Sequence, residues 1–169
     1  MPWRLMTPGD LAQVQVLADA IHVDHPEDRA VLAERQRLYP SGCFVLTEDA
    51  HVIGYALTHP WHLGEPPRLN RLLGELPSSP TTYYIHDVAL LPTARGRGYA
   101  AQVTDRLIAQ AREAGLDNLS LVAVNGSRTF WEKAGFRVLA AGSLTAKLAS
   151  YGPEAVLMTH PLASPSRGA

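Results

Sequence analysis

The segment from residue 91 to residue 101 reads Leu91-Pro92-Thr93-Ala94-Arg95-Gly96-Arg97-Gly98-Tyr99-Ala100-Ala101. Residues 82–91, at its start, have the composition of a β-strand, and residues 98–114, at its end, have the apolar spacing of an amphipathic helix. Its two glycines allow backbone conformations that other residues avoid, and the first N–H groups of the following helix have no partner within that helix. Together with the two arginines, these groups predict a site for an anion such as a phosphate.

Other readings of the same segment fit less well. It lacks the G-x-x-x-x-G-K-[ST] pattern of a P-loop. It also lacks the G-x-G-x-x-G pattern of a dinucleotide-binding fold, because position 101 is alanine, and no acidic residue follows at the end of the next strand. An Arg-Gly repeat that binds RNA is disfavoured, because the pattern occurs once and inside a folded segment.

Length and composition exclude several classes of protein. The chain has 169 residues, a formal net charge of −1 and one cysteine, Cys43, so internal disulfides and cysteine metal clusters are excluded. We expect one domain over residues 1–163 and a disordered polar tail over residues 164–169. Near-neutral charge argues against nucleic-acid partners, and no apolar run approaches the ~18 residues of a membrane span. Without a signal-peptide pattern, we expect a cytoplasmic protein.

Strand and helix signals alternate along the chain, which predicts an α/β or α+β sheet with helices packed on it. We expect strands at residues 3–6, 43–47, 52–57, 82–91, 119–124, 136–140, 145–150 and 155–158. We expect helices at residues 8–21, 26–38, 98–114 and 127–133. Residues 60–80 contain five prolines and predict a long irregular connection, of a kind that is often functional.

Two segments resemble a known family. Arg95-Gly96-Arg97-Gly98-Tyr99-Ala100 fits the [QR]-x-x-G-x-[GA] signature of the GNAT superfamily of N-acetyltransferases. Residues 125–136 resemble the family's N-x-x-(A)-x-x-F-Y-x-K-x-G-F segment, and the order of expected elements also follows the family. The resemblance implies a central mixed, mostly antiparallel sheet of six to seven strands with about four helices, splayed between the fourth and fifth strands.

The resemblance also implies acetyl-CoA as the cofactor and coenzyme A as the product. The pantetheine arm would pair with the backbone of Val88, Ala89 and Leu90. The pyrophosphate would rest on backbone N–H groups of Arg95, Gly96, Arg97, Gly98, Tyr99, Ala100 and Ala101. Asn125 would contact the cofactor where the strands splay, and Phe130 and Trp131 would lie along its thioester end.

N-acetyl transfer needs an uncharged amine, and His86 is the candidate general base. A lysine-like amine with a pKa of about 10.4 is neutral in about one molecule in 2,500 at pH 7, a deficit of about 4.6 kcal/mol that a base partly relieves. Arylalkylamine-type members of the superfamily carry a histidine at the place of His86. The alternative is a hydrogen-bonded, half-buried histidine. Asp87 follows on the same strand, so we expect it on the opposite face in a structural role.

The leaving thiolate raises the question of an acid. Many members of the family have a tyrosine at the position of Trp131, but an indole N–H cannot deliver a proton near neutral pH. Tyr151 is the candidate replacement, with Tyr84 and Tyr99 as weaker ones. The demand is modest, because a thiol pKa of about 8.5 makes the thiolate a tolerable leaving group.

The preferred hypothesis is therefore an acetyltransferase that moves the acetyl group of acetyl-CoA to a primary amine of a small molecule or peptide, by direct attack in a ternary complex. The alternative, favoured by Trp131, is a catalytically silent sensor module that binds acyl-CoA. We expect a monomer or homodimer with no membrane partner. Cys43 is expected to be an inert core residue, and His59 and His62 are expected to lie in a loop without a metal.

Overall fold

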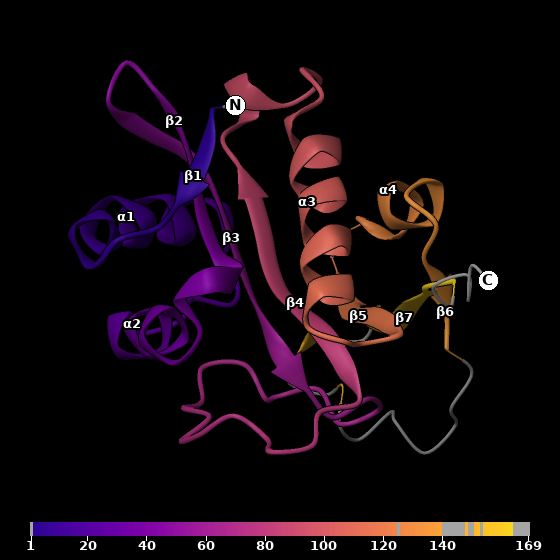
Figure 1. Ribbon diagram of the computed structural model, residues 1–169. Helices are drawn as coiled ribbons and strands as arrows, with labels where there is room; N and C mark the ends of the chain where they lie inside the picture. Colours follow the sequence, from indigo (N-terminus) through magenta and orange to yellow (C-terminus); the bar gives the residue numbers. More distant parts are fainter. Residues whose placement is uncertain (1, 125, 140–147, 149–150, 153, 164–169) are drawn as a thin grey trace.

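A seven-stranded sheet with the order β1-β2-β3-β4-β5-β7-β6 forms the centre of the molecule (Figure 1). The computed structural model describes residues 2–124, 126–139, 148, 151–152 and 154–163. The strands are β1 (Trp3–Leu5), β2 (Cys43–Glu48), β3 (His51–Trp61), β4 (Thr82–Leu90), β5 (Asn118–Ala123), β6 (Arg137–Val138) and β7 (Val156–Pro161). The β4–β5 pair is parallel and the other pairs are antiparallel, which confirms the expected mixed sheet.

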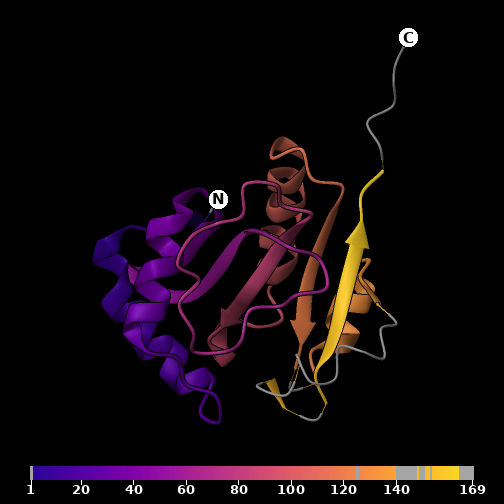
Figure 2. The same ribbon diagram turned by 90° about the horizontal axis from the view of Figure 1, so that it is seen from below.

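Helices cover both faces of this sheet (Figures 1 and 2). They are α1 (Leu11–Ile21), α2 (Arg29–Leu38), α3 (Tyr99–Glu113) and α4 (Arg128–Lys133). Leu17 of α1 packs in one buried cluster with Leu57 of β3, and Leu107 of α3 packs in the other with Ile85 of β4. Each helix therefore buries its apolar stripe against alternate side chains of the strands. None of the described helices is long and apolar enough to cross a membrane.

The strands β4 and β5 diverge along their length. Their pairing joins Tyr83–Ile85 of β4 to Leu119–Leu121 of β5. Beyond these residues β4 continues to Leu90 and β5 to Ala123 without pairing to each other. This divergence confirms the expected splay between the fourth and fifth strands, and it opens the sheet at its centre.

A β-bulge interrupts β4 at His86. In the β3–β4 register, Leu57 lies opposite Asp87 and Thr58 lies opposite Ile85. His86, between them on β4, therefore has no partner residue on β3, and all residues of both strands are described. One extra residue reverses the alternation of side chains along a strand. His86 and Asp87 consequently both turn towards the connection between α1 and α2. The expectation that these two residues face opposite sides of the sheet is wrong for this reason.

The connection from residue 62 to residue 81 contains no helix or strand, as the proline content predicts. It lies at the lower end of the sheet in Figure 1 and passes in front of the strands in Figure 2. The carboxylate of Glu34 on α2 accepts hydrogen bonds from the backbone N–H groups of Leu73 (2.6 Å) and Gly74 (3.0 Å). Arg35 donates to the carbonyl of Arg71 (3.2 Å). Two buried side chains of α2, Glu34 and Arg35, therefore fix this connection in place.

Several boundaries differ from the expected ones. Helix α2 begins at Arg29 rather than at residue 26, because Asp28 has an extended backbone (φ −66°, ψ 150°). Strand β3 continues to Trp61, so it includes His59, which was expected in a loop. The strand expected at residues 145–150 and the tail at residues 164–169 lie outside the described residues, apart from position 148.

Candidate active site

A cavity of about 550 Å³ opens where β4 and β5 diverge. Residues 85–90 of β4 form one wall, and Val122 and Val124 at the end of β5 form another. The remaining lining residues are Ile21, His22, His25, Glu27, Leu69, Arg95, Ala100, Gly126, Ser127, Phe130, Trp131 and Tyr151. The cavity thus brings together all three predicted catalytic residues, which come from positions 86, 131 and 151 of the chain.

The imidazole of His86 forms a hydrogen bond with Glu27, which precedes α2. Its Nε2 lies 2.6 Å from Oε1 of Glu27, and the two side chains are 1% and 10% exposed. The other ring nitrogen, Nδ1, is buried and has no partner among the described residues. Burial alone would raise the pKa of Glu27, but the charge and hydrogen bond of His86 and the backbone N–H of Asn70 together lower it to about 2. Glu27 is therefore an ionised hydrogen-bond acceptor that orients the imidazole.

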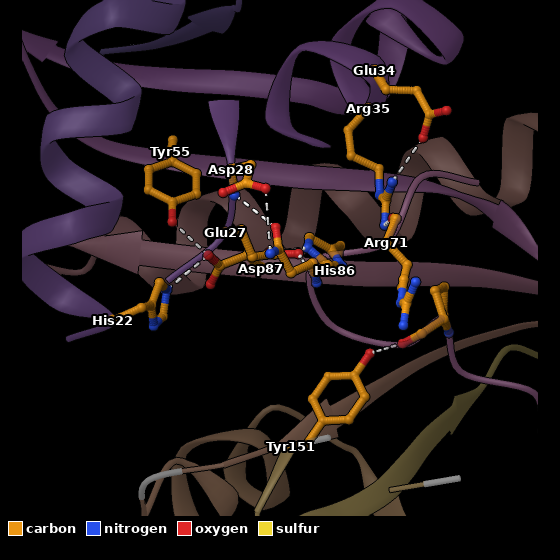
Figure 3. Close-up of polar contacts among 12 residues, drawn as sticks. His22, Glu27, Asp28, Glu34, Arg35, Tyr55, Arg71, His86, Asp87 and Tyr151 are labelled. Atoms are coloured by element: carbon orange, nitrogen blue, oxygen red, sulfur yellow. Dashed lines mark hydrogen bonds and ion pairs between the residues drawn. The ribbon is translucent and has the colours of Figure 1, made fainter. Parts of the chain in front are cut away.

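Asp87 is the centre of a second polar group (Figure 3). Its Oδ2 accepts a hydrogen bond from the hydroxyl of Tyr55 (2.5 Å) and lies 2.8 Å from Nε2 of His22. The hydrogen bond to Asp87 raises the pKa of His22 against the opposing effect of burial. Both His22 and Asp87 line the cavity, so Asp87 lies within the site. The hydrogen bond from Tyr55 also ties Asp87 to β3, which agrees with the structural role expected for Asp87.

Tyr151 lies in the cavity wall with its hydroxyl already engaged. It donates to the carbonyl of Pro67, and its oxygen lies 3.1 Å from the hydroxyl of Tyr84. Burial raises the pKa of Tyr151 to about 12. Trp131 is buried, and its ring packs edge-on against Phe136. Tyr151 thus connects the wall of the cavity to the connection at residues 62–81.

The glycine-rich loop has the backbone that its sequence predicts. Gly96 and Gly98 have positive φ angles of 74° and 82°, and Gly98 caps α3. Arg95 lines the cavity and donates to the carbonyl of Leu90 (3.3 Å), whereas Arg97 pairs with Glu48 at 3.1 Å. Of the other predicted cofactor residues, Val88, Ala89, Leu90, Ala100, Phe130 and Trp131 line the cavity. Gly96, Arg97, Gly98, Tyr99 and Ala101 do not line it, and Asn125 lies outside the described residues.

Two other candidate residues, Cys43 and His59, do not line the cavity. Burial raises the pKa of the Cys43 thiol to about 12, which agrees with an inert core residue. His59 is buried on β3, and burial lowers its pKa to about 3. His59 therefore lies in a strand and not in a loop, contrary to expectation. Within the described residues, no group of three or more histidine, cysteine or acidic side chains is placed to hold a metal ion.

A model of the acetyltransferase (GNAT) family matches residues 12–136 of the chain. The chain belongs to the GNAT acetyltransferase family. The match includes the cavity-lining residues from Ile21 to Trp131, whereas Tyr151 lies beyond it. No curated protein sequence gives a significant match.

Solved structures of GNAT proteins have the same fold. The GphF GNAT-like decarboxylase in complex with isobutyryl-CoA is 19% identical, with 96% of this chain and 100% of that chain covered and a TM-score of 0.79. Ard1 from Thermoplasma volcanium is 18% identical, with 96% and 97% covered and a TM-score of 0.71. N-acetylglutamate synthase from Neisseria gonorrhoeae, complexed with coenzyme A and N-acetyl-glutamate, is 16% identical, with 96% and 35% covered and a TM-score of 0.72. At these identities the likeness concerns the fold, and it agrees with the GNAT family match.

Proposed function

We propose that this GNAT protein transfers the acetyl group of acetyl-CoA to a primary amine of a small molecule or peptide, by direct attack while both substrates are bound. The observation that carries the proposal is the Glu27–His86 pair in the wall of a cavity that opens between diverging strands. Such a site combines an oriented base with an extended strand edge, and acyl transfer to an amine needs both.

Two features of the cavity support acetyl-CoA as its ligand. Beyond Ile85, β4 is released from β5, so the backbone of Val88, Ala89 and Leu90 can pair with an extended pantetheine arm. The first N–H groups of α3 suit a pyrophosphate, and a Cβ built on Gly98 would meet no atom within 4 Å, so the loop surface there is open to a ligand. When bound, acetyl-CoA supplies an acetyl thioester.

His86 is the proposed general base. The Glu27 carboxylate accepts the proton on Nε2 of His86, so Nδ1 is the basic nitrogen. Nδ1 has no partner among the described residues, and the ring lines the cavity. In this role Nδ1 takes a proton from the acceptor amine, and Glu27, as a positioning residue, stabilises the imidazolium that results. This relay is worth about 10²-fold or more in rate.

Tyr151 is the proposed proton donor for the departing thiolate, with a limited effect on the rate. Its pKa of about 12 keeps it protonated at neutral pH, but its proton is donated to the Pro67 carbonyl. Because a thiolate with a pKa of about 8.5 departs without much assistance, we expect a small contribution from this step. Trp131 then serves as part of the apolar wall beside the thioester end.

A screen of amines with acetyl-CoA, read by mass spectrometry for acetylated products and by release of free thiol, tests the proposal. Acetyl-CoA binding, measured by calorimetry, is a separate readout. Acetylation of at least one amine, lost in His86→Gln, is the expected result. Tight acetyl-CoA binding without transfer to any amine, unchanged in Trp131→Tyr, would instead identify a silent sensor module.

A further inference from the structure

We propose that the acceptor is a small cationic amine that carries no carboxylate beside its amino group, and that Asp87 and His86 bind this amino group. The inference rests on the proposed acetyltransferase function, because it concerns the substrate of the same cavity. It follows from the hydrogen-bonding character, the charge and the enclosure of the wall that α1, α2 and β4 form together.

Asp87 has a carboxylate oxygen that is free to accept hydrogen bonds from a ligand. Both hydrogen bonds of its side chain, from Tyr55 and with His22, go to the same oxygen, Oδ2. The other oxygen, Oδ1, has no partner among the residues that the structure describes. The side chain is 16% exposed and lines the cavity beside Val88. A carboxylate oxygen in this position accepts hydrogen bonds and cannot donate them.

His86 has a ring nitrogen, Nδ1, without a partner among the described residues. In the neutral imidazole, the contact between Nε2 and the Glu27 carboxylate places the ring proton on Nε2, which leaves Nδ1 as an acceptor. Nδ1 is buried and unpartnered within the described structure, in a side chain that is 1% exposed and lines the cavity. A buried acceptor without a donor is rare in folded proteins. An N–H group of a ligand supplies the missing donor.

The β-bulge makes these two acceptors neighbours. Because His86 has no partner in the β3–β4 register, His86 and Asp87 both face the side of α1 and α2 (Figure 3). In a regular strand they would point to opposite faces. The bulge therefore builds a wall of adjacent hydrogen-bond acceptors, and a group with several N–H donors, such as an ammonium, is its complement.

The charge of the lining residues favours the same ligand. Glu27 and Asp87 are the described acidic lining residues, and Arg95 is the sole lysine or arginine in the described lining. Arg95 donates to the carbonyl of Leu90, three residues further along β4 than Asp87. Arg35 offsets part of the charge of Glu27, but it pairs with Glu34 at 3.0 Å and does not line the cavity. His22, whose pKa the hydrogen bond to Asp87 raises, also lines the cavity, but it is already paired with Oδ2 of Asp87. A carboxylate placed beside an amine at Oδ1 of Asp87 would therefore face the like charges of Asp87 and Glu27.

The enclosure of the wall limits the size of the acceptor. Leu69 and Ile21 line the cavity, so an apolar body can follow the amino group. The connection at residues 62–81 is held over this side by Glu27, whose Oε2 accepts from Asn70, and by Tyr151. The cavity of about 550 Å³ must also hold the pantetheine arm. The remaining space suits a small amine.

Matched ligands test the proposal without turnover. The protein is saturated with coenzyme A, and the affinities of isopentylamine, leucinol and leucine are measured by calorimetry at pH 8. These ligands share the branched body, and leucinol has a neutral hydroxymethyl group where leucine has its carboxylate. We expect isopentylamine and leucinol to bind at least tenfold more tightly than leucine. Equal affinities, or no binding by either of the first two, would overturn the proposal.

An Asp87→Asn variant tests the residue. We expect its affinity for isopentylamine to fall at least tenfold while its affinity for coenzyme A stays within twofold, and Glu132→Gln, which neutralises an exposed carboxylate outside the cavity, should bind both like the wild type. An unchanged amine affinity in Asp87→Asn would overturn the role of Asp87. If that variant does not fold, the ligand series still decides. Amine binding without acetylation would contradict the acetyltransferase function alone, and acetylation with equal affinities would contradict the acceptor class alone.

Discussion

Glu27 Oε1 lies 2.6 Å from Nε2 of His86, although 59 positions separate the two residues in the chain. Glu27 stands before the first turn of α2, and His86 is the bulged residue of β4. The contact therefore joins the helical layer to the strand at which the sheet opens. It also fixes the ring proton of His86 on the side away from the free nitrogen, as an oriented base requires.

His86→Gln should reduce turnover by about 10²-fold at neutral pH, because it removes the proposed base and leaves the cavity walls in place. The acidic limb of the pH–rate profile should disappear with it. Steady-state kinetics across pH 5–9 with one amine provide the measurement. A variant with the same profile as the wild type would exclude His86 as the base.

Glu27→Gln should lower kcat about tenfold, because an amide does not hold the ring proton on Nε2 of His86 as the carboxylate does. Glu27 does not need to touch the substrate for this effect, so kcat should change more than the KM for the amine, whereas a merely structural role would change both. Glu132→Gln, on the exposed surface of α4, is the matched control and should change neither quantity.

Gly98→Val should abolish acetyl-CoA binding and leave a folded protein. The left-handed backbone at Gly98 (φ 82°) is strained for valine, and the side chain would cover the surface on which we place the pyrophosphate. Gly115→Val is the matched control, because Gly115 has a similar φ of 76° at the other end of α3. Calorimetry and thermal melting separate the two effects. Loss of binding in both variants would point to strain in place of a phosphate site.

The elements that the sequence predicts well are those with local causes. The positive φ angles of Gly96 and Gly98 follow from residue type and from their place between a strand and a helix. The splay between β4 and β5 was expected from the family resemblance, and His86 was expected at the site for the same reason. These features depend on short stretches of chain that carry recognisable patterns.

The partners of the site residues could not be predicted in the same way. His22 and Tyr55 reach Asp87 across 65 and 32 positions, and no spacing in the sequence marks these contacts. The bulge at His86 reverses the side-chain alternation, but the surrounding residues read as a regular strand. The bulge and these contacts depend on how distant elements pack together, and this packing cannot be deduced from a single sequence.

Tyr151→Phe should lower kcat by less than tenfold, because a thiolate with a pKa of about 8.5 leaves without a strong acid and the Tyr151 proton is already donated to Pro67. The same change removes a tether of the connection at residues 62–81. We therefore expect a larger effect on the KM for the amine than on kcat, together with faster proteolysis within this connection. A fall of kcat by 10²-fold or more with an unchanged KM would mean that Tyr151 is an essential acid.

Stability towards acid should depend on Glu27. Its folded pKa of about 2 lies below the ordinary value of 4.5, so its contribution is fully present above pH 4.5 and is lost as the pH falls towards 2. A difference of this size corresponds to at most about 3 kcal/mol of unfolding free energy. Urea titrations of the wild type and Glu27→Gln between pH 3 and pH 7 measure it. The gap between the two proteins should be largest at pH 7 and should narrow below pH 4.5, since protonation leaves the wild type with an uncharged side chain like that of the variant. A gap that stays constant over this range would mean that the charge of Glu27 does not stabilise the fold.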